Sequence, residues 1–159
     1  MGMYTTLHPS PVGDILLRAD EEGRLTDLYL RHDGASSTDG PFDAIREQLD
    51  AYFAGELERF DVRLAVHGTD FQMRVWDQLM RIPFGETISY SELARRMGDP
   101  KLVRAVGVAN GRNPISIVIP CHRVIGADGS LVGYGGGLER KKWLLEHEEV
   151  TSGRRLPVG

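Results

Sequence analysis

Residues 113–124 read NPISIVIPCHRV, and this stretch determines how the rest of the chain is interpreted. Residues 115–119 are apolar except for Ser116, a pattern typical of a buried strand or extended segment. A proline, a cysteine, a histidine and an arginine follow directly at positions 120–123. The chain therefore carries a thiol and an imidazole side by side out of its interior, and Cys121 serves either packing or reactivity.

Cys121 is the only cysteine among 159 residues, which excludes an internal disulfide and a Cys-rich zinc site. A lone buried cysteine is most often a small packing residue. The adjacent His122 favours reactivity, because an imidazole linked to a carboxylate can take the thiol proton and leave a nucleophilic thiolate. We expect Glu148 to be that carboxylate, since it lies on a predicted terminal helix that has to pack on the core. We expect neither a metal site nor a cofactor.

The first half of the chain has the pattern of a small α/β layer. Three short β-prone runs separated by turn-forming residues predict a three-stranded meander. They span residues 3–8, 14–19 and 24–31. A polar stretch at 33–40 precedes apolar residues at helical spacing from Phe42 to Phe53, which predict an amphipathic helix covering the sheet. Residues 60–66 predict one more strand or an extended linker.

The second half is predicted to be helical. Thr69 is a good N-cap for a helix with a buried stripe from Phe71 to Met80 that Pro83 ends. Ser89 or Ser91 then caps a short helix reaching Met97. A tight turn at 98–100 leads into a helix over residues 101–110. A glycine-rich loop at 133–137 precedes a last helix over 139–149, with Trp143, Leu144 and His147 along it.

The short helices on either side of residues 98–100 indicate a helix-turn-helix, although an ordinary helical hairpin has the same pattern. Lys101 and Arg104 are three residues apart, so we expect them on one helix face, where small neighbouring residues would allow a close approach to DNA. Residues 1–67 hold 6 basic and 13 acidic side chains, whereas residues 68–159 hold 13 and 10. Within a net charge of −4, this asymmetry permits the second half to face phosphate.

Composition bounds the remaining classes of protein. Hydrophobic residues make up 41% and charged residues 26%, which is typical of a folded chain and not of a disordered one. No apolar run approaches the roughly 20 residues of a membrane span, and the start lacks a signal core, so we expect a cytoplasmic protein. We expect domains at 1–67 and 68–150 and a tail at 151–159.

The motifs around Cys121 resemble those of the O6-alkylguanine-DNA alkyltransferases. They are the PCHRV sequence at 120–124, Asn113-Pro114 upstream, and Gly133-Tyr134 with Gly136-Gly137 downstream. The resemblance runs motif by motif from about residue 69 to 148, and before that it rests on element order. It implies an α+β fold, in which a small N-terminal ribonuclease-H-like α/β layer packs on a C-terminal helical, winged-helix-like DNA-binding half.

The same resemblance implies a DNA-repair activity. The protein would transfer an alkyl group, such as methyl, irreversibly from O6 of a flipped-out guanine to its own cysteine, each molecule reacting once. Such a methylated-DNA–[protein]-cysteine S-methyltransferase needs no cofactor. Its partner would be double-stranded DNA containing O6-alkylguanine, bound through the minor groove by the helix-turn-helix. We expect a monomer in the absence of DNA.

Roles follow from the resemblance position by position. Cys121 would be the alkyl acceptor, and His122 with Glu148 would form the proton path to its thiolate through a water. Asn113 would brace the hinge before the cysteine segment. Arg104 would fill the place that the flipped base leaves in the stack, with Lys101 nearby on the DNA-binding face.

The guanine pocket is implied in the same way. The hydroxyl of Tyr90 would serve guanine N3, so Tyr90 is expected both in catalysis and in DNA binding. The backbone carbonyls of Cys121 and Val124 would accept hydrogen bonds from the exocyclic amine. Tyr134, Gly135 and Gly136 would border the O6 side. Gly135 stands where some relatives carry serine, so the backbone alone would serve O6 there.

Two other functional classes stay open at this point. The chain could be a DNA-binding module, either a non-catalytic alkylation-lesion sensor or a thiol-based regulator. Inactive relatives of the alkyltransferases replace the cysteine, however, and Cys121 argues against that group. A cysteine hydrolase would have the Cys and the His but would also need an oxyanion hole, and adjacent placement of the pair is unusual for it.

Overall fold

The computed structural model describes residues 3–30 and 40–153 of the chain. The chain forms two compact units. The first comprises Met1–Val66 together with Pro114–Val118, and the second comprises His67–Asn113 and Ile119–Gly159. The polar stretch expected at 33–40 lies outside the described residues except for Gly40. After Asn113 the chain thus leaves the second unit for five residues, and it re-enters that unit at Ile119, two residues before Cys121.

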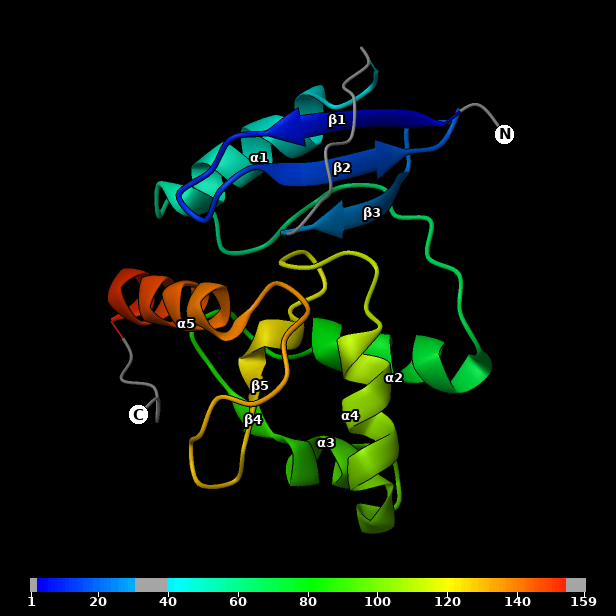
Figure 1. Cartoon of the computed structure of the whole chain (residues 1–159), viewed down its shortest axis with the longest axis vertical. Coiled ribbons are helices and arrows are strands. Elements are labelled where there is room, and N and C mark those ends of the chain that lie inside the picture. The colour runs from blue at the N-terminus through cyan, green and yellow to red at the C-terminus, as the bar shows by residue number, and fades with distance from the viewer. Residues whose placement is uncertain (1–2, 31–39, 154–159) are drawn as a thin grey trace. The chain divides into compact units, whose positions relative to one another are not determined.

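The first unit contains the predicted meander and helix. Strands β1 (Tyr4–His8), β2 (Ile15–Ala19) and β3 (Leu25–Tyr29) form an antiparallel sheet in that order, and α1 (Asp43–Phe53) runs along one of its faces (Figure 1). Thr6, Leu17 and Leu28 are aligned across the three strands. Arg46 of α1 donates a hydrogen bond to the Thr6 hydroxyl over 2.6 Å, so this is the face that α1 covers.

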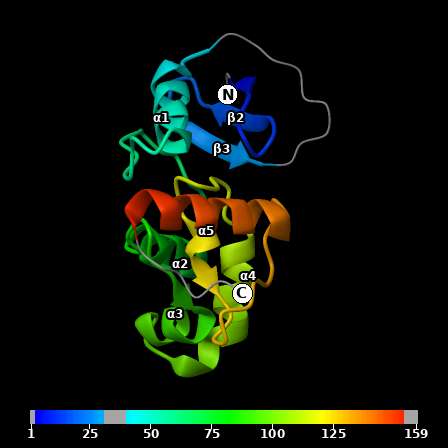
Figure 2. The ribbon, with the colours of Figure 1, turned by 90° about the vertical axis from the view of Figure 1, so that its left-hand side faces the viewer.

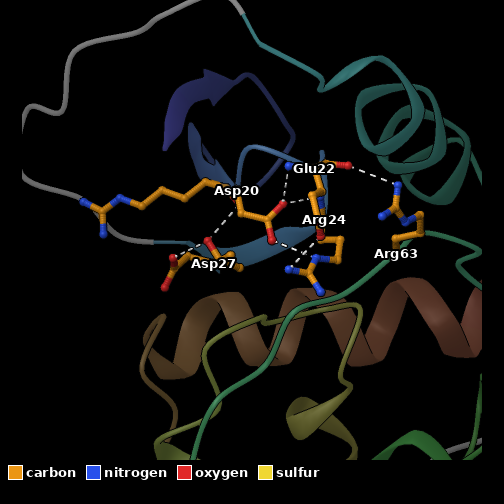
Figure 3. Close-up of polar contacts among 7 residues, drawn as sticks. Asp20, Glu22, Arg24, Asp27 and Arg63 are labelled. Carbon is orange, nitrogen blue, oxygen red and sulfur yellow. Dashed lines mark hydrogen bonds and ion pairs between the residues drawn. The ribbon is translucent and has the colours of Figure 1, made fainter. Parts of the chain in front are cut away.

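The turn from β2 to β3 is closed by one carboxylate. Asp20 accepts hydrogen bonds from the backbone of Glu22 and Arg24 and from the Arg24 guanidinium, and Figure 3 shows these contacts. Arg63 reaches the same turn through the Glu22 carbonyl at 3.1 Å. Leu64 makes a single parallel bridge to Leu25. Residues 60–66 are therefore the extended linker and not a further strand.

The second unit opens with α2 (Asp70–Met80), which starts at the predicted cap. The Thr69 hydroxyl accepts from Gln72 N at 3.1 Å, and the Gln72 side chain accepts from Thr69 N at 3.0 Å, so two otherwise unpaired donors are satisfied. Val75, Trp76 and Leu79 are buried, as expected. Met80 was expected in the same stripe but is 47% exposed, because the helix ends there and this side chain lies off the buried face.

Helix α3 (Tyr90–Arg96) is capped by Ser89, and α3 packs against α4 (Val103–Gly111) (Figure 1). The helix expected over 101–110 begins later, because Pro100–Leu102 forms a 3-10 turn whose Asp99 side chain accepts from Lys101 N at 2.9 Å. The expectation that Lys101 and Arg104 share one face of a single α-helix is therefore wrong: Lys101 lies in the preceding turn.

The apolar side chains of the segment predicted at 115–119 are buried, yet residues 114–118 belong to the first unit. Pro114 O accepts from Leu28 N at 2.9 Å, and Ser116 N donates to Leu28 O at 3.0 Å, so the segment bridges β3 without forming a strand of its own. The chain then forms a 3-10 turn (Cys121–Arg123) and β5 (Val124–Ile125), which pairs in parallel with β4 (Ile88–Ser89).

The last helix, α5 (Leu138–Ser152), lies next to the 3-10 turn that carries the cysteine (Figure 2). Its buried residues are Lys141, Leu144, Leu145 and Glu148. Trp143 and His147 lie along this helix as expected, and their partly buried rings stack on each other 5.0 Å apart. Residues 151 and 152, expected in a tail, are helical. Among the described residues, no helix has the length and hydropathy to cross a membrane.

The cap of α2 gives a first test. Thr69→Ala should lower the free energy of unfolding by about 1 kcal/mol, because the Gln72 amide loses its acceptor and the side chain of residue 69 is exposed. Urea denaturation followed by tryptophan fluorescence reports this unit through Trp76. Thr69→Ser keeps the hydroxyl and should remain close to the wild type. Equal destabilisation by both substitutions would assign the effect to the lost methyl group instead.

Candidate active site

The cysteine segment is fixed where the chain re-enters the second unit. The Asn113 side chain donates from Nδ2 to Ile119 O over 2.7 Å, joining the residue before the excursion to the first residue after it. Both Asn113 and Cys121 are buried, and Cys121 is 4% exposed. Cys121 and His122 are consecutive residues of one 3-10 turn. Asn113 thus lies where a residue bracing the cysteine would have to lie.

His122 and Glu148 meet in the interior. The distance from His122 Nε2 to Glu148 Oε2 is 2.7 Å, and both side chains are fully buried. Because an ionised carboxylate can only accept, Nε2 carries the ring proton and Nδ1 keeps a free lone pair. Within the described part of the chain, Nδ1 has no hydrogen-bond partner. The arrangement presents a basic nitrogen one residue away from the thiol.

Arg123 is a third member of this cluster that the sequence analysis left without a role. Its Nε and Nη2 atoms donate to the two Glu148 oxygens at 2.8 and 3.1 Å, and Nη1 donates to Ile82 O at 2.7 Å. The guanidinium also lies 5.6 Å from the Phe84 ring centroid. Burial alone would raise the pKa of Glu148, but His122 and Arg123 outweigh it, so the pKa is lowered well below the ordinary range.

The same surroundings keep His122 neutral. Burial lowers the pKa of His122, and the positive charges of Arg123 and Lys141 act in the same direction. Glu148 opposes these effects through its charge and its hydrogen bond, but the pKa remains below its ordinary value. A neutral imidazole with a free lone pair can accept a proton, which a protonated one cannot.

Lys141 is a fully buried cation that sequence reasoning missed. Its Nζ donates to Val124 O at 2.7 Å and to Val132 O at 3.0 Å. No carboxylate of the described residues forms an ion pair with it. Burial lowers the pKa of Lys141 to about 8, while the Cys121 thiol opposes the shift. The spacing of 141, 144, 145 and 148 along one helix face is the signal that could have identified it.

Tyr90 lies between α4 and the loop that follows β5. Its hydroxyl donates to Val132 O at 3.1 Å, and its ring lies 5.8 Å from Lys141 Nζ. A Cβ added at Gly107 would be 3.9 Å from the ring, an ordinary van der Waals distance, so this part of α4 lies beside Tyr90. Burial and the nearby Cys121 raise the pKa of Tyr90, and a hydrogen bond with Asn110 partly offsets this. Tyr90 therefore stays protonated and can donate.

The glycine-rich loop carries the other expected pocket residues. Gly137 N donates to Tyr134 O at 3.0 Å, and Arg140 donates to Gly136 O at 2.9 Å, which fixes the start of α5. Tyr134 is half-buried, Gly136 is buried and Gly135 is exposed. A Cβ at Gly135 would meet no atom within 4 Å, so there is open space beside it. The loop is thus joined to the start of α5 by two hydrogen bonds.

Arg104 and Lys101 lie outside the buried cluster. Both are exposed, Arg104 at the start of α4 and Lys101 in the turn before it. Neither forms an ion pair with a carboxylate of the described residues. In the same part of the chain no group of three or more metal-ligating side chains comes together. Arg104 and Lys101 are therefore exposed, whereas Cys121, His122 and Glu148 are buried.

Lys141 predicts a specific dependence of stability on pH. Its pKa is about 8 when folded and 10.5 ordinarily, so between these pH values the unfolded chain binds more protons and the free energy of unfolding should rise with pH. Lys141→Met should lack this rise. Denaturation of both proteins in a Cys121→Ser background, from about pH 7 to about pH 10, removes the thiol titration and tests the difference. Parallel curves would mean that Lys141 is not buried as a cation.

Comparisons with known proteins agree with this geometry. The family model described as "6-O-methylguanine DNA methyltransferase, DNA binding domain" matches residues 70–150, and the ribonuclease-like domain of the same family matches residues 3–66. The methylated-DNA–protein-cysteine methyltransferase of Methanosarcina acetivorans is 49% identical over 155 residues, covering 92% of this chain and 98% of the relative. The Mycobacterium tuberculosis protein of that name is 61% identical over 110 residues, covering 69% of this chain and 67% of the relative.

Solved structures show the same likeness along the whole chain. The crystal structure of the M. tuberculosis O6-methylguanine methyltransferase matches with a TM-score of 0.87 and 47% identity over 94% of each chain. The structure of the M. tuberculosis protein in complex with DNA matches with a TM-score of 0.86 and 50% identity, over 92% of this chain and 93% of that one. From the cysteine motif, the two matched domains and these relatives, this chain belongs to the 6-O-methylguanine DNA methyltransferase family.

Proposed function

We propose that Cys121 is the residue on which this methylated-DNA–protein-cysteine methyltransferase takes up the alkyl group of a damaged guanine. The activity is the one that its relatives at 49–61% identity are named for. The observation that supports Cys121 is the neutral His122, whose free nitrogen lies one residue from the only thiol and is oriented by a buried carboxylate. No other cysteine could serve.

The reaction begins with removal of the thiol proton. His122 accepts it on Nδ1, with a water as the connection, and the resulting imidazolium is stabilised by Glu148. Lys141 favours the thiolate electrostatically, because an ammonium interacts with Cys121 in a buried setting. Arg123 holds the Glu148 carboxylate in place through two hydrogen bonds. The four side chains together produce the nucleophile.

Alkyl transfer is then a single displacement at carbon. The thiolate forms an S–C bond as the C–O6 bond breaks, and the electron pair of that bond stays on the guanine, which leaves as an anion. A hydrogen bond from the Tyr90 hydroxyl to N3 stabilises this charge as it develops. Tyr90 keeps its proton because of its raised pKa, and substrate would replace Val132 O as its acceptor. The thioether product has no good leaving group, so the protein is consumed.

The protein binds DNA, as the M. tuberculosis relative crystallised with DNA indicates. We further propose that the bound DNA is a duplex that carries O6-alkylguanine and that α4 enters its minor groove. Cys121 is buried, so a base inside the duplex cannot reach it and has to be flipped out. Arg104, exposed at the start of α4, suits the gap left in the base stack, because its guanidinium is planar. Lys101 suits a phosphate.

A lesion sensor or a thiol-based regulator is less well supported than the transferase. Binding alone needs an exposed recognition helix, which α4 supplies. It does not need a buried histidine, carboxylate and arginine joined at 2.7 and 2.8 Å beside a thiol. Burying such charges costs free energy that a sensor would gain nothing from.

Stoichiometry tests the proposed chemistry. Incubation with an excess of duplex DNA containing O6-methylguanine should add one methyl group per protein molecule, located by mass spectrometry on the peptide bearing Cys121. Cys121→Ser should show no transfer and should keep its affinity for the same duplex. Demethylation of more than one guanine in the DNA per protein molecule would contradict a thioether end point. A methyl group on another residue would contradict the assignment of Cys121 as the acceptor.

Arg104 and Lys101 should separate base flipping from phosphate binding. Arg104→Ala should slow reaction with duplex DNA by roughly tenfold or more but leave reaction with free O6-benzylguanine unchanged, because the free base needs no flipping. Lys101→Ala should weaken duplex binding modestly, and by less at high salt. The quantities to measure are single-turnover rates and binding at two salt concentrations.

Pairing the lesion with an abasic site provides the control, since unstacking then costs less. It should partly restore the rate of Arg104→Ala and should not restore Cys121→Ser. If Arg104→Ala slows the duplex and the free base by the same factor, Arg104 supports the fold or the pocket and does not occupy the stack.

A further inference from the structure

One buried polar atom beside the cysteine has no role in the mechanism above. Asn110, at the end of α4, is 2% exposed, and its Oδ1 has no hydrogen-bond partner among the described residues. Leaving a buried amide oxygen unpaired destabilises a protein by roughly 1–3 kcal/mol, so such atoms are rare in native structures. An unpaired acceptor that persists next to a reactive group points to a donor on the substrate.

The orientation of this amide is determined by its neighbour. Asn110 Nδ2 donates to Cys121 O at 3.4 Å. Rotating the amide by half a turn would bring Oδ1 against the Cys121 carbonyl, and two acceptors would then repel each other. Nδ2 is therefore the atom that faces Cys121 O, and Oδ1 is the atom left without a partner.

The two carbonyls expected to bind the guanine amine are already engaged. Cys121 O accepts from Val124 N and from Asn110 Nδ2, which uses both of its lone pairs. Val124 O accepts from Lys141 Nζ at 2.7 Å. Cys121 O is thus fully engaged, whereas Val124 O keeps one lone pair that can accept from the amine. Asn110 Oδ1 is a buried acceptor in this neighbourhood without a partner among the described residues, and unlike His122 Nδ1 it has no role in the proton transfer.

Asn110 also lies beside Tyr90. Asn110 lies close enough to partly offset the raised pKa of Tyr90, and Gly107, one turn earlier on the same face of α4, lies beside the Tyr90 ring. A tyrosine hydroxyl donor and an amide acceptor are therefore neighbours. Guanine presents the complementary pair at adjacent positions, because N3 accepts a hydrogen bond and the exocyclic N2 amine donates one.

We propose that Asn110 is a specificity-determining residue, whose Oδ1 accepts a hydrogen bond from the N2 amine of the flipped alkylguanine while Tyr90 donates to N3. The inference rests on the proposed function and goes beyond it by assigning recognition of the base. Adenine-type and hypoxanthine-type bases lack the amine and would leave Oδ1 unpaired in a closed pocket. The protein would therefore reject them, because the missing bond exposes an unsatisfied buried group.

The test removes each partner of this hydrogen bond in turn. Single-turnover transfer to Cys121 is measured with duplexes carrying O6-methylguanine or O6-methylhypoxanthine, which differ only in the N2 amine. The wild type should react at least about tenfold faster with the guanine lesion, and Asn110→Leu should reduce this preference by roughly tenfold. Asn110→Asp keeps the size and an acceptor oxygen, so it should retain the preference even if its rates fall.

Val106→Ala is the matched control, because it weakens packing of the same helix one turn earlier without touching the amide. It should lower stability and leave the preference unchanged. Equal wild-type rates on the two lesions would overturn the inference without any variant, even if Asn110→Leu failed to fold. An unchanged preference in Asn110→Leu, or equal loss in Asn110→Asp, would also overturn it. Failure of the wild type to methylate Cys121 would instead refute the proposed function.

Discussion

The Glu148 carboxylate is the group on which the rest of the site depends. It is fully buried and is contacted by His122, by two nitrogens of Arg123 and, at 3.4 Å, by Gly85 N. An unpaired charge at this position would cost several kcal/mol, so the helix, the 3-10 turn and the loop before β4 have to meet for the carboxylate to be tolerated. The contact that orients His122 is thus also the contact that docks α5.

The charges around the thiol explain why the site is reactive. With the thiol protonated and His122 neutral, the interior holds one anion, Glu148, and two cations, Arg123 and Lys141. Arg123 is neutralised by direct contact, whereas Lys141 is hydrogen-bonded only to carbonyls in the described structure. In the proposed mechanism, the surplus positive charge favours an anion nearby, first the thiolate and then the departing guanine. Burying the Lys141 ammonium costs free energy, and this cost accompanies the electrostatic stabilisation of the anion.

The elements that could be predicted from the sequence are those determined by nearby residues. The Thr69 and Ser89 caps and the adjacent Cys121 and His122 depend on spacing along the chain. The rotation of α5 about its axis does not, because its buried face holds Lys141 and Glu148, and apolar periodicity does not identify a face on which charged residues are buried. The unpaired oxygen of Asn110 depends on packing against Tyr90 and Cys121, which no local pattern encodes.

The excursion of residues 114–118 into the first unit is fixed by its own contacts and contains one strained residue. Ile117 has φ of 72°, a strained conformation for a β-branched residue that costs of order 1–3 kcal/mol. Such strain persists only where the surroundings fix the chain. Leu28 fixes it through bonds to Pro114 and Ser116, and the Asn113 amide fixes it through Ile119. Within the second unit, the Asn113 amide closes the base of this excursion directly before Cys121.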